Sequence, residues 1–188
     1  MIESNNPSAV RSKIEITQAL LKLMGEYPYS EITVKQIILT ASLARKTFYR
    51  NFESKDDVLC SLIKKSFREY FDIVNNARGD VLTTIFSYAE KNRDILMLLE
   101  KNDMLHMVLK CMNEDGPLLR KNEVSASNPF NELFEGLDSE YLIALNNGAV
   151  WNVMALWVHR GMKEDPQLVR NTVEEYLGQS LTETAFFQ

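Results

Sequence analysis

The stretch TVKQIILTASLARKTFYRNFESKDDV, residues 33–58, decides the fold, because it predicts two short helices separated by a tight corner. Thr33 is followed three residues later by Gln36, which is the capping-box pattern of a helix N-terminus. Ile37 begins the apolar face of this helix, which ends near Ala41. The pattern indicates the supporting helix of a helix-turn-helix.

The second helix of the pair is predicted from Ala44 to about Asn51, after a corner formed by Ser42 and Leu43. Its spacing turns Phe48 and Phe52 toward a core. The side chains that point outward are polar, basic or aromatic: Arg45, Lys46, Thr47, Tyr49 and Arg50. This is the composition expected of a helix that reads DNA.

A further capping box, Ser54 with Asp57 three residues later, starts the next helix at Lys55. The first turn of a helix presents unpaired backbone N–H groups, which favour an anion. A phosphate is therefore expected beside Lys55.

The sequence ASLARKTFYRNFESKDDVL, from Ala41 to Leu59, resembles the DNA-binding motif of the TetR family of bacterial transcriptional regulators. The resemblance covers about residues 11–59, and beyond them it is only architectural. Two residues depart from the family pattern. Ser42 stands where the family usually has Gly, and Ala44 stands where it usually has a capping Ser or Thr. Each departure is unfavourable by roughly 1 kcal/mol.

The resemblance implies an all-α protein with an N-terminal three-helix helix-turn-helix DNA-binding domain and a C-terminal helical ligand-binding and dimerisation domain. We expect the first domain over residues 1–54, a connecting helix over 55–76, and the effector-binding and dimerisation domain over 77–188. It also implies a homodimer on double-stranded operator DNA, acting as a repressor without a cofactor. A small-molecule effector, not identified by the sequence, would change operator affinity.

Donors at the start of the recognition helix, Arg45 and Lys46, can bond guanine O6 and N7, and Thr47 offers a hydroxyl or a methyl group. The remaining DNA-contact residues are assigned to the phosphate backbone, by position or by the resemblance: Tyr49, Arg50, Asn51, Lys55, Thr33 and Gln36. The alternative for Tyr49 is an aromatic side chain that fills space beside the first helix.

Composition and charge are consistent with this domain arrangement. The chain has 188 residues, 45% of them hydrophobic, and a net charge of −5. Residues 1–72 carry 11 Lys and Arg against 9 Asp and Glu, whereas 73–188 carry 10 against 17. The positive charge therefore lies with the helix-turn-helix. No apolar leader follows Met1, and two cysteines are too few for a disulfide framework, so we expect a reducing cytoplasm.

The rest of the chain is predicted to be helical. The first helix is expected from Pro7 or Ser8 to about Met24, closed by Gly25, and the connecting helix is expected to run to Asn76. Three further helices are expected at Val81–Lys91, Arg93–Lys101 and Met104–Asn113, followed by a mobile polar loop at Glu114–Asn128 and a turn of helix at Phe130–Phe134 ended by Gly136. An apolar helix is expected at Glu140–His159, capped by Ser139 and stopped by Gly161, and a last helix begins with Asp165 and Pro166.

The segment Tyr141–Val158 is apolar on nearly every side, so it is either buried all round or placed in a membrane. Its three asparagines and its length argue against a bilayer. We expect one face to pack on its own domain and the other on a second copy of the chain. A core helix in a monomer is the alternative.

No enzyme motif such as a Walker loop or G-x-S-x-G occurs, so no catalytic residue is assigned and an enzyme is not expected. His106 and Cys111 could form a sensor or metal pair, but packing explains them equally well. Methionine and aromatic residues could line an apolar ligand cavity or form plain core: Phe86, Tyr88, Met104, Met107, Phe130, Phe134, Trp151 and Met154. An alternative function is a helix-turn-helix co-activator or adaptor that acts mainly through a protein partner.

Overall fold

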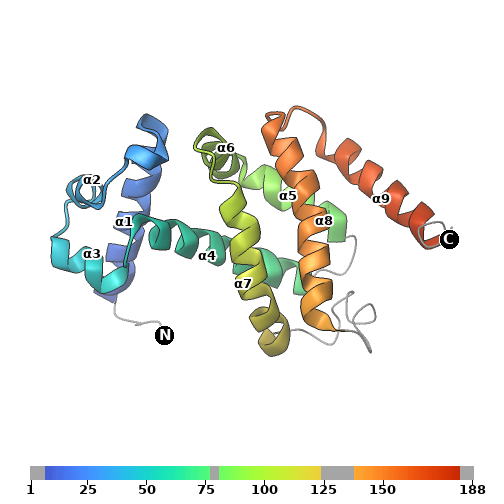
Figure 1. The fold of residues 1–188 in the computed structure, drawn as a ribbon, viewed down its shortest axis with the longest axis horizontal. Coiled ribbons are helices and arrows are strands. Elements are labelled where there is room, and N and C mark those ends of the chain that lie inside the picture. Colours follow the sequence, from blue (N-terminus) through green and yellow to red (C-terminus); the bar gives the residue numbers. More distant parts are fainter. Residues whose placement is uncertain (1–6, 77–80, 124–137, 183–188) are drawn as a thin grey trace.

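The computed structural model describes residues 7–76, 81–123 and 138–182, and these residues form helices joined by short connections (Figure 1). The all-α prediction is confirmed. The helices are α1 (Pro7–Glu26), the short 3-10 helix η1 (Tyr29–Glu31), α2 (Val34–Thr40), α3 (Arg45–Asn51), α4 (Lys55–Asn76), α5 (Val81–Lys91), α6 (Arg93–Lys101), α7 (His106–Glu123), α8 (Ser139–His159) and α9 (Pro166–Thr182).

The helices α1, α2 and α3 form a compact head at one end of the molecule (Figure 1). Each contributes apolar side chains that are almost completely buried: Ile16 and Leu20 from α1, Ile37 from α2 and Phe48 from α3. Burying a side chain of this size stabilises a fold by about 1.5–3 kcal/mol. The short helices α2 and α3 therefore depend on tertiary packing rather than on their own propensity.

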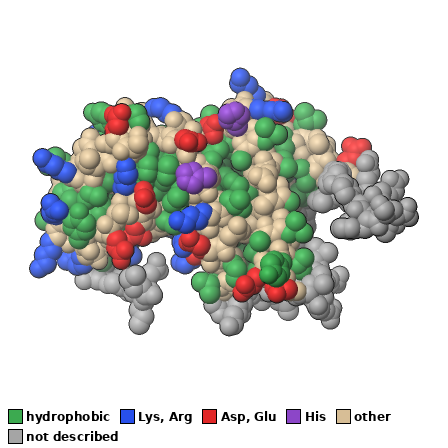
Figure 2. Space-filling model, in the orientation of Figure 1, with side chains coloured by type: hydrophobic (Ala, Val, Ile, Leu, Met, Phe, Trp, Pro, Cys, Tyr) green, Lys and Arg blue, Asp and Glu red, His purple; other side chains and the backbone are tan. Residues whose placement is uncertain are grey.

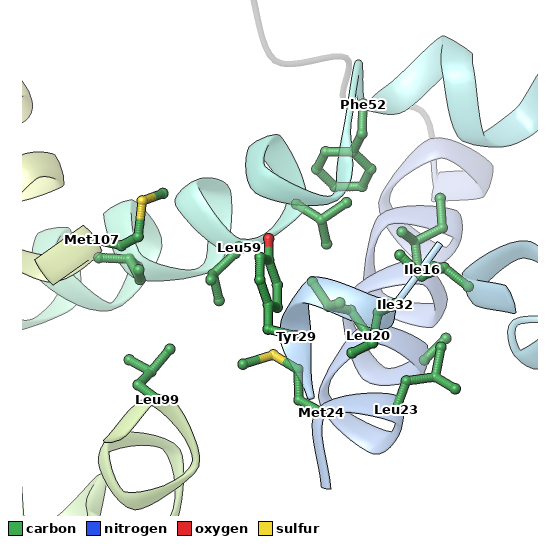
Figure 3. Close-up of a cluster of buried hydrophobic side chains, with 14 of the residues drawn as sticks. Ile16, Leu20, Leu23, Met24, Tyr29, Ile32, Phe52, Leu59, Leu99 and Met107 are labelled. Carbon is green, nitrogen blue, oxygen red and sulfur yellow. The ribbon is translucent and has the colours of Figure 1, made fainter. Parts of the chain in front are cut away.

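The long helix α4 leaves the head and passes behind α7 in the view of Figure 1, and its bounds agree with the sequence prediction. Its first half is part of the core of the head. Figure 3 shows Leu59 of α4 lying between Tyr29 of the head and Met107 of α7, with Leu99 of α6 on the same side as Met107. The head and the C-terminal helices thus share one hydrophobic core, and α4 passes through it.

Several helix boundaries differ from the sequence prediction, and those of α7 differ most. Gly25 does not close α1, which continues to Glu26. α7 starts at His106 instead of Met104 and extends to Glu123, through part of the segment predicted as a mobile loop. The rest of that segment, the predicted turn at Phe130–Phe134 and Gly136 lie outside the described residues.

Tertiary packing explains why α7 continues through Gly116 and Pro117. Gly116 is buried against α8, where a Cβ atom would lie 3.0 Å from Ile143 Cγ2. The neighbouring Asp115 is also buried, and its carboxylate pairs with Arg68 of α4 at 3.1 Å. These contacts along α4 and α8 offset the cost of about 3 kcal/mol for proline inside a helix.

The ends of the last two helices follow the predicted capping chemistry, with one correction. Asp138, and not Ser139, is the N-cap of α8, and its Oδ1 accepts a hydrogen bond from the N–H of Glu140 at 3.0 Å. Gly161 follows the end of α8 with φ at +80°, a conformation that favours glycine. Asp165 accepts a hydrogen bond from the N–H of Gln167 at 2.8 Å and so caps α9.

Helix α8 has the length and composition to cross a membrane, over Glu140–His159 with a mean hydropathy of 1.2. A core helix of a soluble protein also meets these criteria. One face of α8 packs in a second core, where Trp157 and Val158 are buried beside Phe86 of α5. Only 28% of its most apolar 18-residue window is buried, however, and the opposite side exposes large apolar residues: Tyr141, Leu145 and Leu156. We refer to these three residues as the outer face of α8.

Candidate nucleic-acid interface and apolar cavity

The corner between α2 and α3 has the strained geometry that the sequence indicates. Ser42 has φ at +55°, in the left-handed region where a side chain is unfavourable. The N–H of Leu43 donates to the Ile38 carbonyl at 3.1 Å, which closes the turn. Ala44 is the N-cap of α3 with extended backbone, and its side chain provides no hydrogen bond to the helix. The recognition helix therefore starts without the stabilising groups usual at these positions.

The N-terminus of α2 carries the predicted capping box. The N–H of Thr33 donates to Gln36 Oε1 at 2.8 Å, and the Thr33 hydroxyl accepts from the N–H of Gln36 at 3.3 Å. These bonds engage both side chains and fix the direction in which α2 begins. Thr33 is exposed, so its position is compatible with the expected approach to a DNA backbone.

The recognition helix α3 is held by Phe48, which is fully buried and in edge contact with Tyr49. The other side of the helix is exposed and carries basic residues without any carboxylate. Arg45 lies with its guanidinium 5.4 Å from the centre of the Tyr49 ring, which is 48% exposed. Figure 2 shows Lys and Arg side chains gathered at this end of the molecule. The exposed basic residues of the helix are Arg45, Lys46 and Arg50.

A shallow groove between α2 and α3 extends this basic surface. Arg45 and Tyr49 line one wall, and Lys35 with the exposed Leu39 lines the other. Sequence reasoning did not single out Lys35. Its position in the first turn of α2, close to the predicted cap at Thr33, is the signal that could have found it.

The end of α3 is less free than expected. The Asn51 side-chain amide donates to the Thr47 carbonyl at 2.7 Å within the same helix, and both residues are partly buried. The side chain of Asn51, which was assigned to a DNA phosphate, thus has a partner within its own helix. Thr47 lies one helical turn before it on the same side of α3.

Lys55 also differs from the expectation, because its ammonium group is bonded inside the head. It donates to the carbonyl oxygens of Tyr29 at 2.6 Å and Ile32 at 2.9 Å, with Ser30 at 3.4 Å. It also lies 4.5 Å from the centre of the Tyr29 ring. An ammonium group has three donors, and these carbonyls use them. Lys55 therefore ties α4 to η1, rather than standing free for a phosphate.

The same tyrosine is fixed at its other end. The Tyr29 hydroxyl donates to Asp56 Oδ1 at 2.7 Å. Burial, together with this carboxylate, raises the pKa of Tyr29 far above its ordinary value, so the hydroxyl remains a donor. Lys55, bonded to backbone carbonyls, and Asp56, bonded to the Tyr29 hydroxyl, thereby hold η1 against the start of α4.

An apolar cavity of about 120 Å³ lies among α4, α5, α6, α7 and α8. No Lys, Arg, Asp, Glu or His lines it among the described residues. Two polar side chains of the lining have partners in the protein: the Tyr88 hydroxyl donates to the Ser66 carbonyl at 2.7 Å, and the Asn92 amide donates to the Tyr88 carbonyl at 2.8 Å. An uncharged, apolar molecule matches such a lining.

The predicted ligand residues divide between this cavity and the core. Tyr88, Trp151 and Met154 line the cavity. Phe86 packs in the second core beside Trp157, while Met107 and the partly buried Met104 belong to the core shared with the head. None of these three residues lines the cavity: Phe86 and Met107 belong to α5 and α7 but face the cores, and Met104 lies in the connection between α6 and α7. Phe130 and Phe134 lie outside the described residues.

Sequence reasoning missed the α4 wall of the cavity. Leu62, Ile63, Phe67 and Tyr70 line it from the helix that was expected only to connect the two domains. His106 and Cys111 do not form the pair considered from sequence. His106 is exposed with its ring nitrogen 3.1 Å from the Asp103 carbonyl, whereas Cys111 is buried.

Comparison with known proteins supports the assignment of the head. The family "Bacterial regulatory proteins, tetR family" matches residues 16–62. A curated relative, the HTH-type dhaKLM operon transcriptional activator DhaS of Lactococcus lactis subsp. lactis, is 27% identical over 100 residues. That alignment covers 50% of this chain and 53% of the relative, so it spans about half of each protein.

Three solved structures have a similar overall fold. A TetR transcriptional regulator from Streptococcus agalactiae 2603V is 23% identical, with a TM-score of 0.58 over 92% of this chain and 94% of its own. The fatty acid degradation regulator FadR from Bacillus halodurans is 19% identical, with a TM-score of 0.55 over 93% and 96%. FadR from Bacillus subtilis, solved with stearoyl-CoA, is 20% identical, with a TM-score of 0.53 over 87% and 96%.

Proposed function

We propose that this chain, a member of the TetR family of bacterial transcription regulators, is a homodimeric repressor whose operator affinity is set by an apolar small molecule in its C-terminal domain. The observation that carries the DNA part of the proposal is the exposed basic face of α3. Arg45, Lys46 and Arg50 extend from a helix that is anchored by the buried Phe48. Arginine or lysine near the start of such a helix can reach guanine O6 and N7 in a major groove.

Dimerisation is proposed through the outer face of α8. Tyr141 is 78% exposed and Leu145 is 66% exposed, although both belong to a helix that is apolar nearly all round. Exposed apolar surface of this kind marks an interface. A two-fold axis along this face would pair identical surfaces and place two α3 helices on successive turns of DNA.

The size of the cavity supports a link between ligand and DNA. Its volume of about 120 Å³ is smaller than the roughly 300–1,000 Å³ typical of pockets for drug-sized ligands. A larger apolar ligand must therefore move lining helices apart. Because α4 is one of these helices and also starts in the head, its displacement would change the position of α3.

The test of this function is a footprint of the purified chain on DNA upstream of its own coding region. We expect two protected half-sites about 34–36 Å apart, one turn of the duplex. An apolar ligand that changes Trp151 fluorescence should change operator affinity over the same concentration range, by linkage. A ligand that saturates the fluorescence change without altering operator affinity would separate the cavity from regulation.

A second candidate function is activation of transcription through a protein partner. The observation that favours it is the curated relative, which is a transcriptional activator by name. A footprint that forms only after addition of a second protein would support this alternative. A complete footprint by the purified chain alone would support the repressor.

A further inference from the structure

The two cysteines of the chain, 51 residues apart, meet between α4 and α7. Cys60 Sγ lies 2.8 Å from Cys111 Sγ, and both are free thiols. The sequence contains two cysteines in total, so this pair is the one disulfide that can form within a single chain. Spacing in the sequence gave no indication of the contact, because it depends on how α7 packs along α4.

We infer that Cys60 and Cys111 form a reversible disulfide that joins α4 to α7, so that this pair is a site of oxidation. A disulfide bond is about 2.05 Å long, so the two sulfurs need to approach by less than ~1 Å. The surrounding helices already hold them in contact. Small side-chain rotations are then sufficient, and the backbone of α4 and α7 stays in place.

The chemistry needs an oxidant, and hydrogen peroxide or an organic hydroperoxide supplies it. Cys60 is the more exposed of the two, so its thiolate attacks the peroxide oxygen first; the O–O bond breaks and Cys60 becomes a sulfenic acid. Cys111 sulfur then attacks the Cys60 sulfur, its proton leaves with the sulfenic hydroxyl as water, and the S–S bond forms. For hydrogen peroxide, two thiols and one peroxide give one disulfide and two waters.

The environment of Cys111 suits this order of events. Its side chain is fully buried. Burial is the main cause that raises the pKa of Cys111 above the ordinary thiol value, and the contact with Cys60 is the second cause. Cys111 therefore remains a protected thiol until Cys60 has been oxidised. A partner thiol held in contact also limits further oxidation of the sulfenic acid, because it is already in position to condense with it.

The disulfide would restrain the helix that connects the head to the C-terminal domain. One turn further along α4, Lys64 Nζ pairs with Asp115 Oδ1 at 3.2 Å and with Glu114 Oε2 at 2.8 Å, and Arg68 pairs with the same aspartate. The new bond would add a covalent link to this ionic contact. Its regulatory consequence rests on the proposed function: oxidation fixes α4 relative to α7 and so changes operator affinity.

The direct test treats the reduced full-length chain with hydrogen peroxide and counts its thiols after unfolding. We expect both thiols to disappear together, the mass to fall by two hydrogen atoms, and the product to run as a single chain on a non-reducing gel. Dithiothreitol should restore both thiols. Independent gain of oxygen at either cysteine, disulfides between chains, or no reaction would overturn the inference.

Variants at each cysteine identify the order of reaction. In Cys111→Ala, Cys60 should form a sulfenic acid that dimedone traps. In Cys60→Ala, Cys111 should stay unreacted while the chain is folded.

The oxidised natural chain should also unfold at a temperature several degrees higher than the reduced chain, because the bond closes a long loop. Peroxide-treated Cys60→Ala should show no such shift, and an equal shift in that variant would contradict the inference.

These readouts need no DNA, so they succeed or fail independently of the proposed function. The regulatory part is tested by comparing operator affinity of the reduced and oxidised natural chain, with Cys60→Ala given the same treatment. A change in affinity in the natural chain alone supports regulation. Equal affinities with the disulfide formed would remove the regulatory role and leave the oxidation site.

Discussion

The N–H of Tyr29 donates to Asn102 Oδ1 at 2.8 Å, which joins the loop after α1 to the end of α6. The Asn102 amide also donates to the Met24 carbonyl at 3.1 Å, so a single side chain holds the C-terminal end of α1. Beside it, Lys101 donates to the Gly25 carbonyl at 2.7 Å. Because Leu99, on the same helix, lines the cavity, α6 is a second connection between the cavity and the head.

Removal of this connection should weaken the head. Asn102→Ala deletes the partners of the Tyr29 N–H and the Met24 carbonyl, and a buried group left without a partner costs about 1–3 kcal/mol. We expect a loss of that size in the free energy of unfolding, measured by urea denaturation. Asn146→Ala, at an exposed position on α8, is the matched control and should change it by less than about 0.5 kcal/mol. Equal effects of the two variants would contradict a connecting role for Asn102.

The corner of the helix-turn-helix should gain stability when it is returned to the family pattern. Ser42→Gly relieves a left-handed backbone at φ +55°, and Ala44→Ser supplies the missing cap of α3. Each substitution should stabilise the chain by about 1 kcal/mol, which thermal unfolding can detect. Destabilisation by Ser42→Gly would show that the corner is not strained in solution.

Lys55 should stabilise the head rather than contact DNA. Lys55→Met keeps most of the apolar stem but removes the donors to the Tyr29 and Ile32 carbonyls. Hydrogen bonds from a charged donor contribute about 1.5–3 kcal/mol, and we expect a loss of that order in chemical denaturation. An unchanged stability, together with a salt slope of DNA binding lowered by about 1, would instead assign Lys55 to a phosphate.

The dimer should depend on the outer face of α8. Leu156 belongs to this face and is 50% exposed, so Leu156→Glu would bury an unpaired carboxylate in the interface. Sedimentation should then show a monomer. Ile14→Glu, equally exposed at 50% but on α1, should leave the dimer intact; the same result for both variants would place the interface elsewhere.

Local sequence patterns predicted the helices whose first or last residues contain their own capping or terminating signals. The capping box at Thr33 and Gln36 and the glycine at 161 gave correct helix ends, because these signals act within a few residues. The buried Phe48 opposite a basic face was likewise readable from helical spacing. The all-α architecture and the recognition helix follow from such local signals.

Features created by tertiary packing could not be read from the chain. Pro117 lies inside α7 because Asp115 and Gly116 are buried against neighbouring helices, and nothing local indicates those partners. Lys55 looked like a free cation, but the carbonyls that engage it come from residues more than 20 positions earlier. The contact between Cys60 and Cys111 has the same origin.

The reading of operator DNA by the basic face of α3 is tested by measuring the operator affinity of Arg45→Ala. We expect a loss of about 1–3 kcal/mol on the natural operator and a relaxed preference at one base-pair position. Lys163→Ala, an exposed cation between α8 and α9, should bind like the natural chain. Unchanged affinity and base preference in Arg45→Ala, in a protein that still binds its operator, would contradict this role of α3.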